Sequence, residues 1–152
     1  MASSIPVPPK RLLIAVKAND LDARLIETAV SLARVFDATL HVLHVGAPEP
    51  EFVGYKVGPW NVRDDVASHL REEHRAIQLL RDRLEAAGCS VGKILMVQGA
   101  IAEAIVKEAI RLETEMILLG YRQHSGLHHL IQGDVTEEVV KHSPCPVLVI
   151  PE

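Results

Sequence analysis

The sequence predicts a single α/β domain built on a parallel β-sheet with helices on both faces. Short apolar runs, rich in β-branched and aliphatic residues, alternate along the chain with longer segments of helical periodicity. Strands and helices that alternate in this way connect through right-handed crossovers and form a parallel sheet. The length of 152 residues fits one domain with one continuous core.

Five apolar runs predict the strands of this sheet. They cover residues 12–17, 39–45, 93–97, 116–120 and 147–150. Their apolar residues are continuous, which is typical of strands that are buried on both faces. We therefore expect an open, five-stranded, Rossmann-like sheet.

Four segments with apolar residues at helical spacing predict the helices. Their apolar stripes fall within residues 20–36, 66–84, 101–112 and 135–140. Asn19 or Asp20 is suited to cap the start of the first helix. The second helix is long and is expected to stop at Gly88.

Charge and composition exclude several classes of protein. The net charge of -4 arises from mixed acidic and basic residues without a basic stripe, so nucleic acid is not an expected partner. The apolar runs are shorter than the roughly 20 residues that cross a bilayer, and residues 1–11 lack the pattern of a secretory signal. We expect a cytoplasmic protein, with a flexible leader at 1–9 and the domain at 10–152. Cys89 and Cys145 do not suggest a disulfide framework.

The segment from Ile117 to Pro151 contains the predicted ligand site. It joins two strands through a loop with spaced glycines and a helix. Gly120 ends a strand, where the lack of a side chain lets the backbone approach a ligand. Gly133 is expected to open the fourth helix, whose first N–H groups would be free to bind an anion. The pattern therefore predicts a phosphate site.

The glycine spacing resembles the nucleotide-binding signature of the universal stress protein family, which is Gly-x-x-Gly, nine residues, then Gly followed by Ser or Thr. Gly120 and Gly133 match the first and last glycines, whereas Gln123 replaces the second glycine and Asp134 replaces the hydroxyl residue. The runs TLHVLHV and SPCPVLVIP resemble the second and last strands of the family, and the likeness extends along nearly the whole chain from Lys10. The resemblance implies the strand order 3-2-1-4-5, with the ligand crevice between the first and fourth strands.

The resemblance also implies which residues would bind an adenine nucleotide, ATP or AMP. They are Ala15, Lys17, Val45, Leu119, Gly120, Arg122, Gln123, Gly133, Asp134, Val135 and Thr136. The family commonly has Pro and Asp where this chain has Ala15 and Lys17, so the local charge at the end of the first strand is reversed.

Lys17 and Asp134 carry opposite charges at the expected crevice, and two interpretations remain open. They form an internal ion pair in the place of a bound phosphate, or Asp134 caps the fourth helix and Lys17 is solvated. Both predict weakened triphosphate binding, because a carboxylate at a helix start occupies the field that would stabilise a phosphate. Arg122 is either an anion ligand or an ordinary loop arginine.

These features favour a binding or signalling module with weakened or lost ATP binding over an enzyme, and the resemblance implies that it serves the stress response. No Ser or Cys nucleophile has an identifiable base, no Walker lysine follows a glycine loop, and His124 and His128 are interpreted as loop residues and not as metal ligands. The alternative is a genuine ATP or AMP binder that uses Lys17 and Arg122 for phosphate contacts. A slow nucleotide hydrolase with a metal near Asp134 is a third reading.

Two further surfaces suggest protein partners. The last strand, Val147, Leu148, Val149 and Ile150, would lie at a sheet edge and is expected to pair with its copy in a homodimer. The long loop at 46–63 carries Phe52, Tyr55 and Trp60. It forms either a flap or interface contact, or a plug over the sheet edge.

Overall fold

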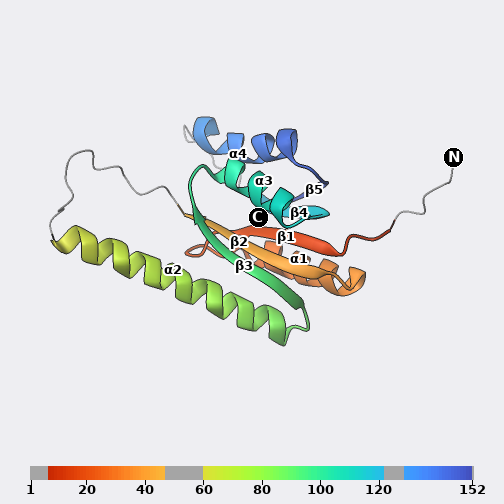
Figure 1. The fold of residues 1–152 in the computed structure, drawn as a ribbon, viewed down its shortest axis with the longest axis horizontal. Coiled ribbons are helices and arrows are strands. Elements are labelled where there is room, and N and C mark those ends of the chain that lie inside the picture. Colours follow the sequence, from red (N-terminus) through yellow and green to blue (C-terminus); the bar gives the residue numbers. More distant parts are fainter. Residues whose placement is uncertain (1–6, 47–59, 122–128, 152) are drawn as a thin grey trace.

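The computed structural model describes residues 7–46, 60–121 and 129–151, with side chains for all of these except 60–65 and 129–134. Strands and helices alternate in this part of the chain (Figure 1). In chain order they are β1 (Arg11–Val16), α1 (Ala23–Phe36), β2 (Thr39–Gly46), α2 (Trp60–Ala86), β3 (Ser90–Gln98), α3 (Ile101–Arg111), β4 (Met116–Tyr121), α4 (His129–His142) and β5 (Val147–Pro151).

The strands form one parallel sheet in the order β3-β2-β1-β4-β5, which confirms the predicted fold and strand order. Helices α1 and α2 cover one face and helices α3 and α4 cover the other (Figure 1). From β1 the chain adds β2 and β3 on one side of β1, and it then adds β4 and β5 on the other side of β1. The strand order therefore reverses between β1 and β4. A reversal of this kind is where open α/β sheets bind ligands.

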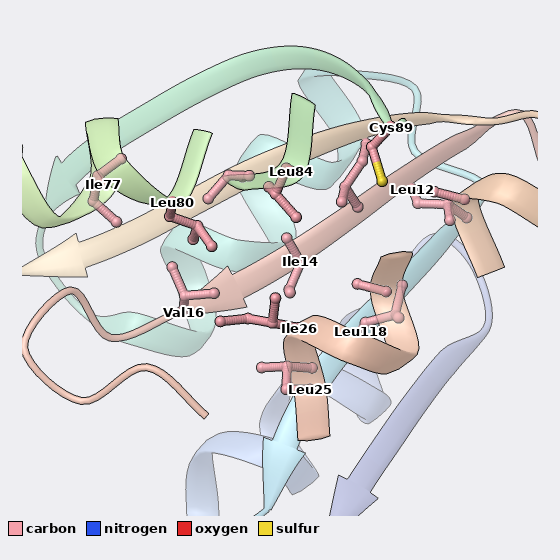
Figure 2. Packing of buried hydrophobic residues seen from close by; sticks show 14 of the residues in the cluster. Leu12, Ile14, Val16, Leu25, Ile26, Ile77, Leu80, Leu84, Cys89 and Leu118 are labelled. Carbon is pink, nitrogen blue, oxygen red and sulfur yellow. The ribbon is translucent and has the colours of Figure 1, made fainter. Parts of the chain in front are cut away.

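The core consists of two apolar layers, one on each face of the sheet. Because side chains alternate along a strand, β1 supplies Leu12, Ile14 and Val16 to the layer under α1 and α2, and Leu13 to the opposite layer. Ile14 is fully buried in the first layer, in the middle of the cluster that Figure 2 shows. Burial on both faces explains why the run at 12–16 shows no polar alternation.

Helix α1 begins later than the sequence predicted. Its N-cap is Asp22, whose Oδ1 accepts a hydrogen bond of 2.9 Å from the Arg24 N–H, so the expected cap at Asn19 or Asp20 is wrong. A turn precedes the helix, in which the Asp20 N–H donates to the Lys17 carbonyl at 3.1 Å. All three residues can cap a helix, and the turn decides which of them does.

Helix α4 begins earlier than predicted, at His129. Gly133 and Asp134 therefore lie inside the helix, and the expectation that Gly133 opens it is wrong. A single glycine inside a helix costs only about 0.5–1 kcal/mol, so it does not by itself end or begin one. The free N–H groups of this helix therefore lie at its start near His129 and not at Gly133.

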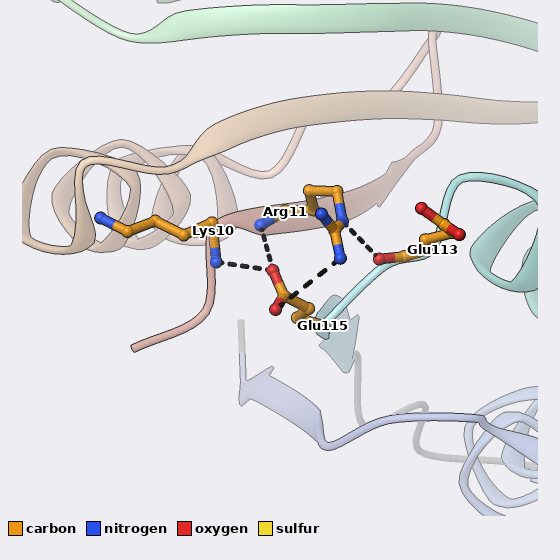
Figure 3. Close-up of polar contacts among 4 residues, drawn as sticks. All are labelled: Lys10, Arg11, Glu113 and Glu115. Atoms are coloured by element: carbon orange, nitrogen blue, oxygen red, sulfur yellow. Dashed lines mark hydrogen bonds and ion pairs between the residues drawn. The ribbon is translucent and has the colours of Figure 1, made fainter. Parts of the chain in front are cut away.

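The amino ends of β1 and β4 are joined by polar contacts (Figure 3). Glu115 Oε2 accepts hydrogen bonds from the backbone N–H groups of Lys10 at 2.8 Å and Arg11 at 3.0 Å, and Arg11 Nε donates to the Glu113 carbonyl at 2.7 Å. This cluster lies at the edge of the sheet opposite to the carboxyl ends of the strands. We therefore assign it to stability and not to ligand binding.

His41 occupies an irregularity between β2 and β3. The strand register shifts between Leu40 and Val42, and His41 Nδ1 accepts a 2.8 Å hydrogen bond from the Lys93 N–H. The ring lies so close to Gly92 that a Cβ there would be 2.5 Å from it. Burial, with smaller contributions from Lys93 and Arg11, lowers the pKa of His41 below its ordinary value of 6.5.

The lowered pKa of His41 predicts a loss of stability in acid. Below about pH 6.5 the unfolded chain binds a proton on His41 that the folded protein binds only at lower pH, so the free energy of unfolding should fall as pH falls. His41→Asn keeps a hydrogen-bond acceptor near the Nδ1 position and cannot titrate, and should therefore lose part of this pH dependence in urea unfolding. His74→Asn changes an exposed histidine of α2 and serves as the control. Equal pH slopes for the wild type and His41→Asn would contradict the prediction.

Candidate functional site

The carboxyl ends of β1 and β4 lie side by side and form the candidate ligand edge. Ala15 pairs with Leu119 in the sheet register, which places the following residues, Lys17 and Gly120, at the same edge. Val45 reaches this edge from β2, since His44 pairs with Val16. Lys17 is exposed, whereas Val45 and Gly120 are partly buried and Leu119 is buried. The structure thus brings these five predicted residues together.

Gly120 faces the start of α1 closely. A Cβ built on Gly120 would lie 3.2 Å from Asp22 Oδ2 and 3.5 Å from Leu25 Cδ2. Asp22 Oδ1 is used by the helix cap, and its buried Oδ2 has no hydrogen-bond partner among the described residues. A carboxylate therefore stands beside the strand end at which a phosphate was predicted, and it favours hydrogen-bond donors over anions.

Sequence reasoning missed Asp22 as a site residue. Three residues that can cap a helix, Asn19, Asp20 and Asp22, occur within a few positions, and only the observed turn brings Asp22 to Gly120. Its signal in the sequence was a carboxylate just before the apolar stripe of α1.

The proposed pairing of Lys17 with Asp134 stays a prediction, because the Asp134 side chain lies outside the described part. The other interpretation, in which Asp134 caps α4, is wrong because the helix begins at His129. Val135 and Thr136 are partly buried on α4, and Val135 packs against the apolar layer on that face. The remaining predicted ligand residues, Arg122 and Gln123, fall outside the described residues, as do His124, His128, Phe52 and Tyr55.

His44 makes polar contacts that the sequence did not reveal. It is 4% exposed at the carboxyl end of β2. Its Nδ1 lies 3.2 Å from both the Ala18 nitrogen and the Val16 oxygen, and its Nε2 lies 3.3 Å from Glu73 Oε2 of α2. The Nε2 contact has the distance of an ion pair without the geometry of a well-directed hydrogen bond.

A parallel α/β sheet whose order reverses beside a glycine at a strand end defines a Rossmann-like, ligand-binding class of protein. Within this class, the chain belongs to the universal stress protein family, whose model matches residues 9–151. The match confirms the family that the glycine spacing and the last strand indicated.

Relatives of known family agree with this assignment. Universal stress protein MJ0531 of Methanocaldococcus jannaschii is 29% identical over 143 residues, which cover 93% of this chain and 81% of the relative. Universal stress protein YxiE of Bacillus subtilis is 27% identical over 92% of this chain and 97% of its own length.

Solved structures agree in fold. The structure of MJ0577, a universal stress protein of Methanocaldococcus jannaschii, has a TM-score of 0.69 at 27% identity and covers 96% of this chain and 98% of that protein. A universal stress protein in complex with cAMP has a TM-score of 0.68 at 18% identity, with 95% and 98% of the two chains covered, and supports the fold alone. None of the helices in the described segments combines the length and apolarity needed to span a membrane.

Proposed function

We propose that this protein is a cytoplasmic binding module of the stress response that binds ATP weakly or not at all and acts through contacts with other proteins. Membership in the universal stress protein family supports the stress-response role. The observation that carries the weak ATP binding is the Asp22 carboxylate, which faces Gly120 at the ligand edge.

The charges at the ligand edge support reduced affinity for phosphate. A carboxylate about 4 Å from a phosphate oxygen costs about 1 kcal/mol in water and about 4 kcal/mol near a protein surface, or roughly five-fold to several hundred-fold in affinity. Lys17 is exposed, so solvent screens its compensating charge.

A genuine ATP or AMP binder that uses Lys17 and Arg122 is the second candidate. The exposure of Lys17 at the ligand edge favours it, because an accessible ammonium group can reach a phosphate. The position of Asp22 opposes it. The cAMP in the structure of a distant family member makes adenine nucleotides the natural probes.

Isothermal titration calorimetry with ATP tests the proposal. We expect the unmodified protein to bind too weakly to be saturated at cellular ATP concentrations. Asp22→Asn removes the charge but keeps a capping side chain, and should tighten ATP binding about tenfold or more. Gln123→Gly together with Asp134→Ser restores the family signature and should also improve affinity.

The matched control is Asp37→Asn at the opposite end of α1. Asp37 has φ 49, which asparagine tolerates, so this variant removes one negative charge far from Gly120. Its ATP affinity should equal that of the wild type. Tight, stoichiometric binding of ATP by the unmodified protein would refute the proposal in favour of the second candidate.

We further propose a symmetric homodimer formed through β5. This strand lies at the edge of the sheet, so one row of its backbone N–H and C=O groups is free to pair with another strand. Leu148 is 37% exposed there, whereas Ile150 is buried. Pairing with its own copy across a twofold axis would cover Leu148 and complete the hydrogen bonds of the edge.

A further inference from the structure

His44 joins three parts of the molecule at the ligand edge. It projects from the end of β2 toward the face that α1 and α2 cover, and its ring is buried. Nδ1 contacts the backbone on both sides of Lys17, at Val16 and Ala18, each at 3.2 Å. Nε2 contacts Glu73 of α2 at 3.3 Å. A single side chain thus links the long helix to the connection between β1 and α1.

We propose that His44 is a positioning residue that connects α2 to the backbone around Lys17 and sets the conformation of this part of the ligand edge. The contacts of His44 with Ala18, Val16 and Glu73 lie within the protein, so they can be tested without a ligand. An effect of His44 on ligand binding rests on the function proposed above.

The contacts select one tautomer of the neutral ring. With the proton on Nε2, the ring donates toward the Glu73 carboxylate and Nδ1 accepts from the Ala18 N–H. With the proton on Nδ1, the ring would donate to the Val16 carbonyl, but its N–H would oppose that of Ala18 and its Nε2 lone pair would face the carboxylate. The Nε2–H tautomer accepts the Ala18 N–H and turns its own proton toward the Glu73 carboxylate without repulsion, so it is the one that the geometry favours.

NMR spectroscopy of the 15N-labelled protein tests this arrangement directly. We expect ring nitrogen shifts of an Nε2–H tautomer and a scalar coupling across the hydrogen bond between the Ala18 nitrogen and His44 Nδ1. An Nδ1–H tautomer, or the absence of this coupling, would overturn the proposal.

Variants separate positioning from simple packing. His44→Leu fills the space without an acceptor and should lower the exchange protection of the Ala18 amide about tenfold, whereas His44→Asn keeps an acceptor near Nδ1 and should retain most of it. Glu73→Ala should also lower Ala18 protection, and Glu72→Ala, which removes the same charge from an exposed neighbouring position, should not. If His44→Leu does not fold, the scalar coupling in the wild type and the comparison of Glu73→Ala with Glu72→Ala still test the proposal. Equal protection in Glu73→Ala and Glu72→Ala would refute the connection to α2, and the strength of ATP binding has no bearing on either result.

Discussion

Gly92→Ala is expected to destabilise the fold by about 2–3 kcal/mol, because a Cβ at this position overlaps fixed atoms. It would lie 2.5 Å from His41 Cε1 and Nδ1 and 2.8 Å from Thr39 Cγ2. The imidazole cannot move aside freely, since its Nδ1 accepts the Lys93 N–H, and displacing the ring would leave that donor unpaired. Urea unfolding monitored by circular dichroism measures the change.

Gly46→Ala is the matched control for this substitution. Gly46 is also a strand glycine, but the atoms nearest to a Cβ there are 3.8 Å away. We expect it to be neutral or slightly stabilising, because alanine reduces the entropy of the unfolded chain. His41→Ser should remove the overlap with the ring and leave only that with Thr39 Cγ2, so the loss in the double variant with Gly92→Ala should be smaller than the sum of the single losses. Strict additivity would show that the ring does not exclude a side chain at position 92.

Leu148→Lys is expected to convert the proposed dimer into a monomer. A twofold interface contains two copies of Leu148, each 37% exposed in the single chain, and burying this remaining surface contributes roughly 0.5–1 kcal/mol per copy. Loss of both contributions should raise the dimer dissociation constant about tenfold. The introduced lysines would also repel each other across the axis. Light scattering over a concentration series measures the change, and a wild-type protein that is monomeric at micromolar concentration would exclude the dimer.

Val35→Lys controls for a surface change from an apolar residue to lysine. Val35 is 77% exposed on α1 and is not part of β5, so this variant should keep the association state of the wild type. The Leu148→Lys monomer should unfold at a temperature near that of the wild-type monomer, since Leu148 is partly exposed within one chain. Dissociation by Val35→Lys as well would indicate that dimerisation does not depend on β5.

The elements and their order follow from local patterns, which is why they could be predicted. The run at 12–16 is apolar at every position because both faces of β1 are covered, and this feature requires no knowledge of the neighbouring strands. The end of α2 could likewise be predicted, because Gly88 adopts φ 86 just beyond the helix. Gly120 was identified as a residue of the ligand edge from a local pattern as well, because it is a glycine that ends an apolar run.

The ends of helices were harder to predict, because several residues satisfy the same local rule. Asn19, Asp20 and Asp22 all cap helices well, and the turn after β1 leaves Asp22 to do so. At α4, Gly133 resembled a helix start, but the small cost of one internal glycine permits the helix to extend back to His129. Each shift changes which backbone N–H groups and which carboxylate stand near the ligand edge.

The sequence by itself determined the family, the parallel α/β fold and the strand ends that form the ligand edge, because these depend on periodicity and on glycine spacing. Only the tertiary structure decided that Asp22 faces Gly120 and that His44 joins Glu73 to the backbone beside Lys17. Those contacts link residues far apart in the chain, and their existence depends on how α1 and α2 pack against the sheet. Packing of this kind is set by the three-dimensional fit of many side chains and leaves no periodic signal in the sequence.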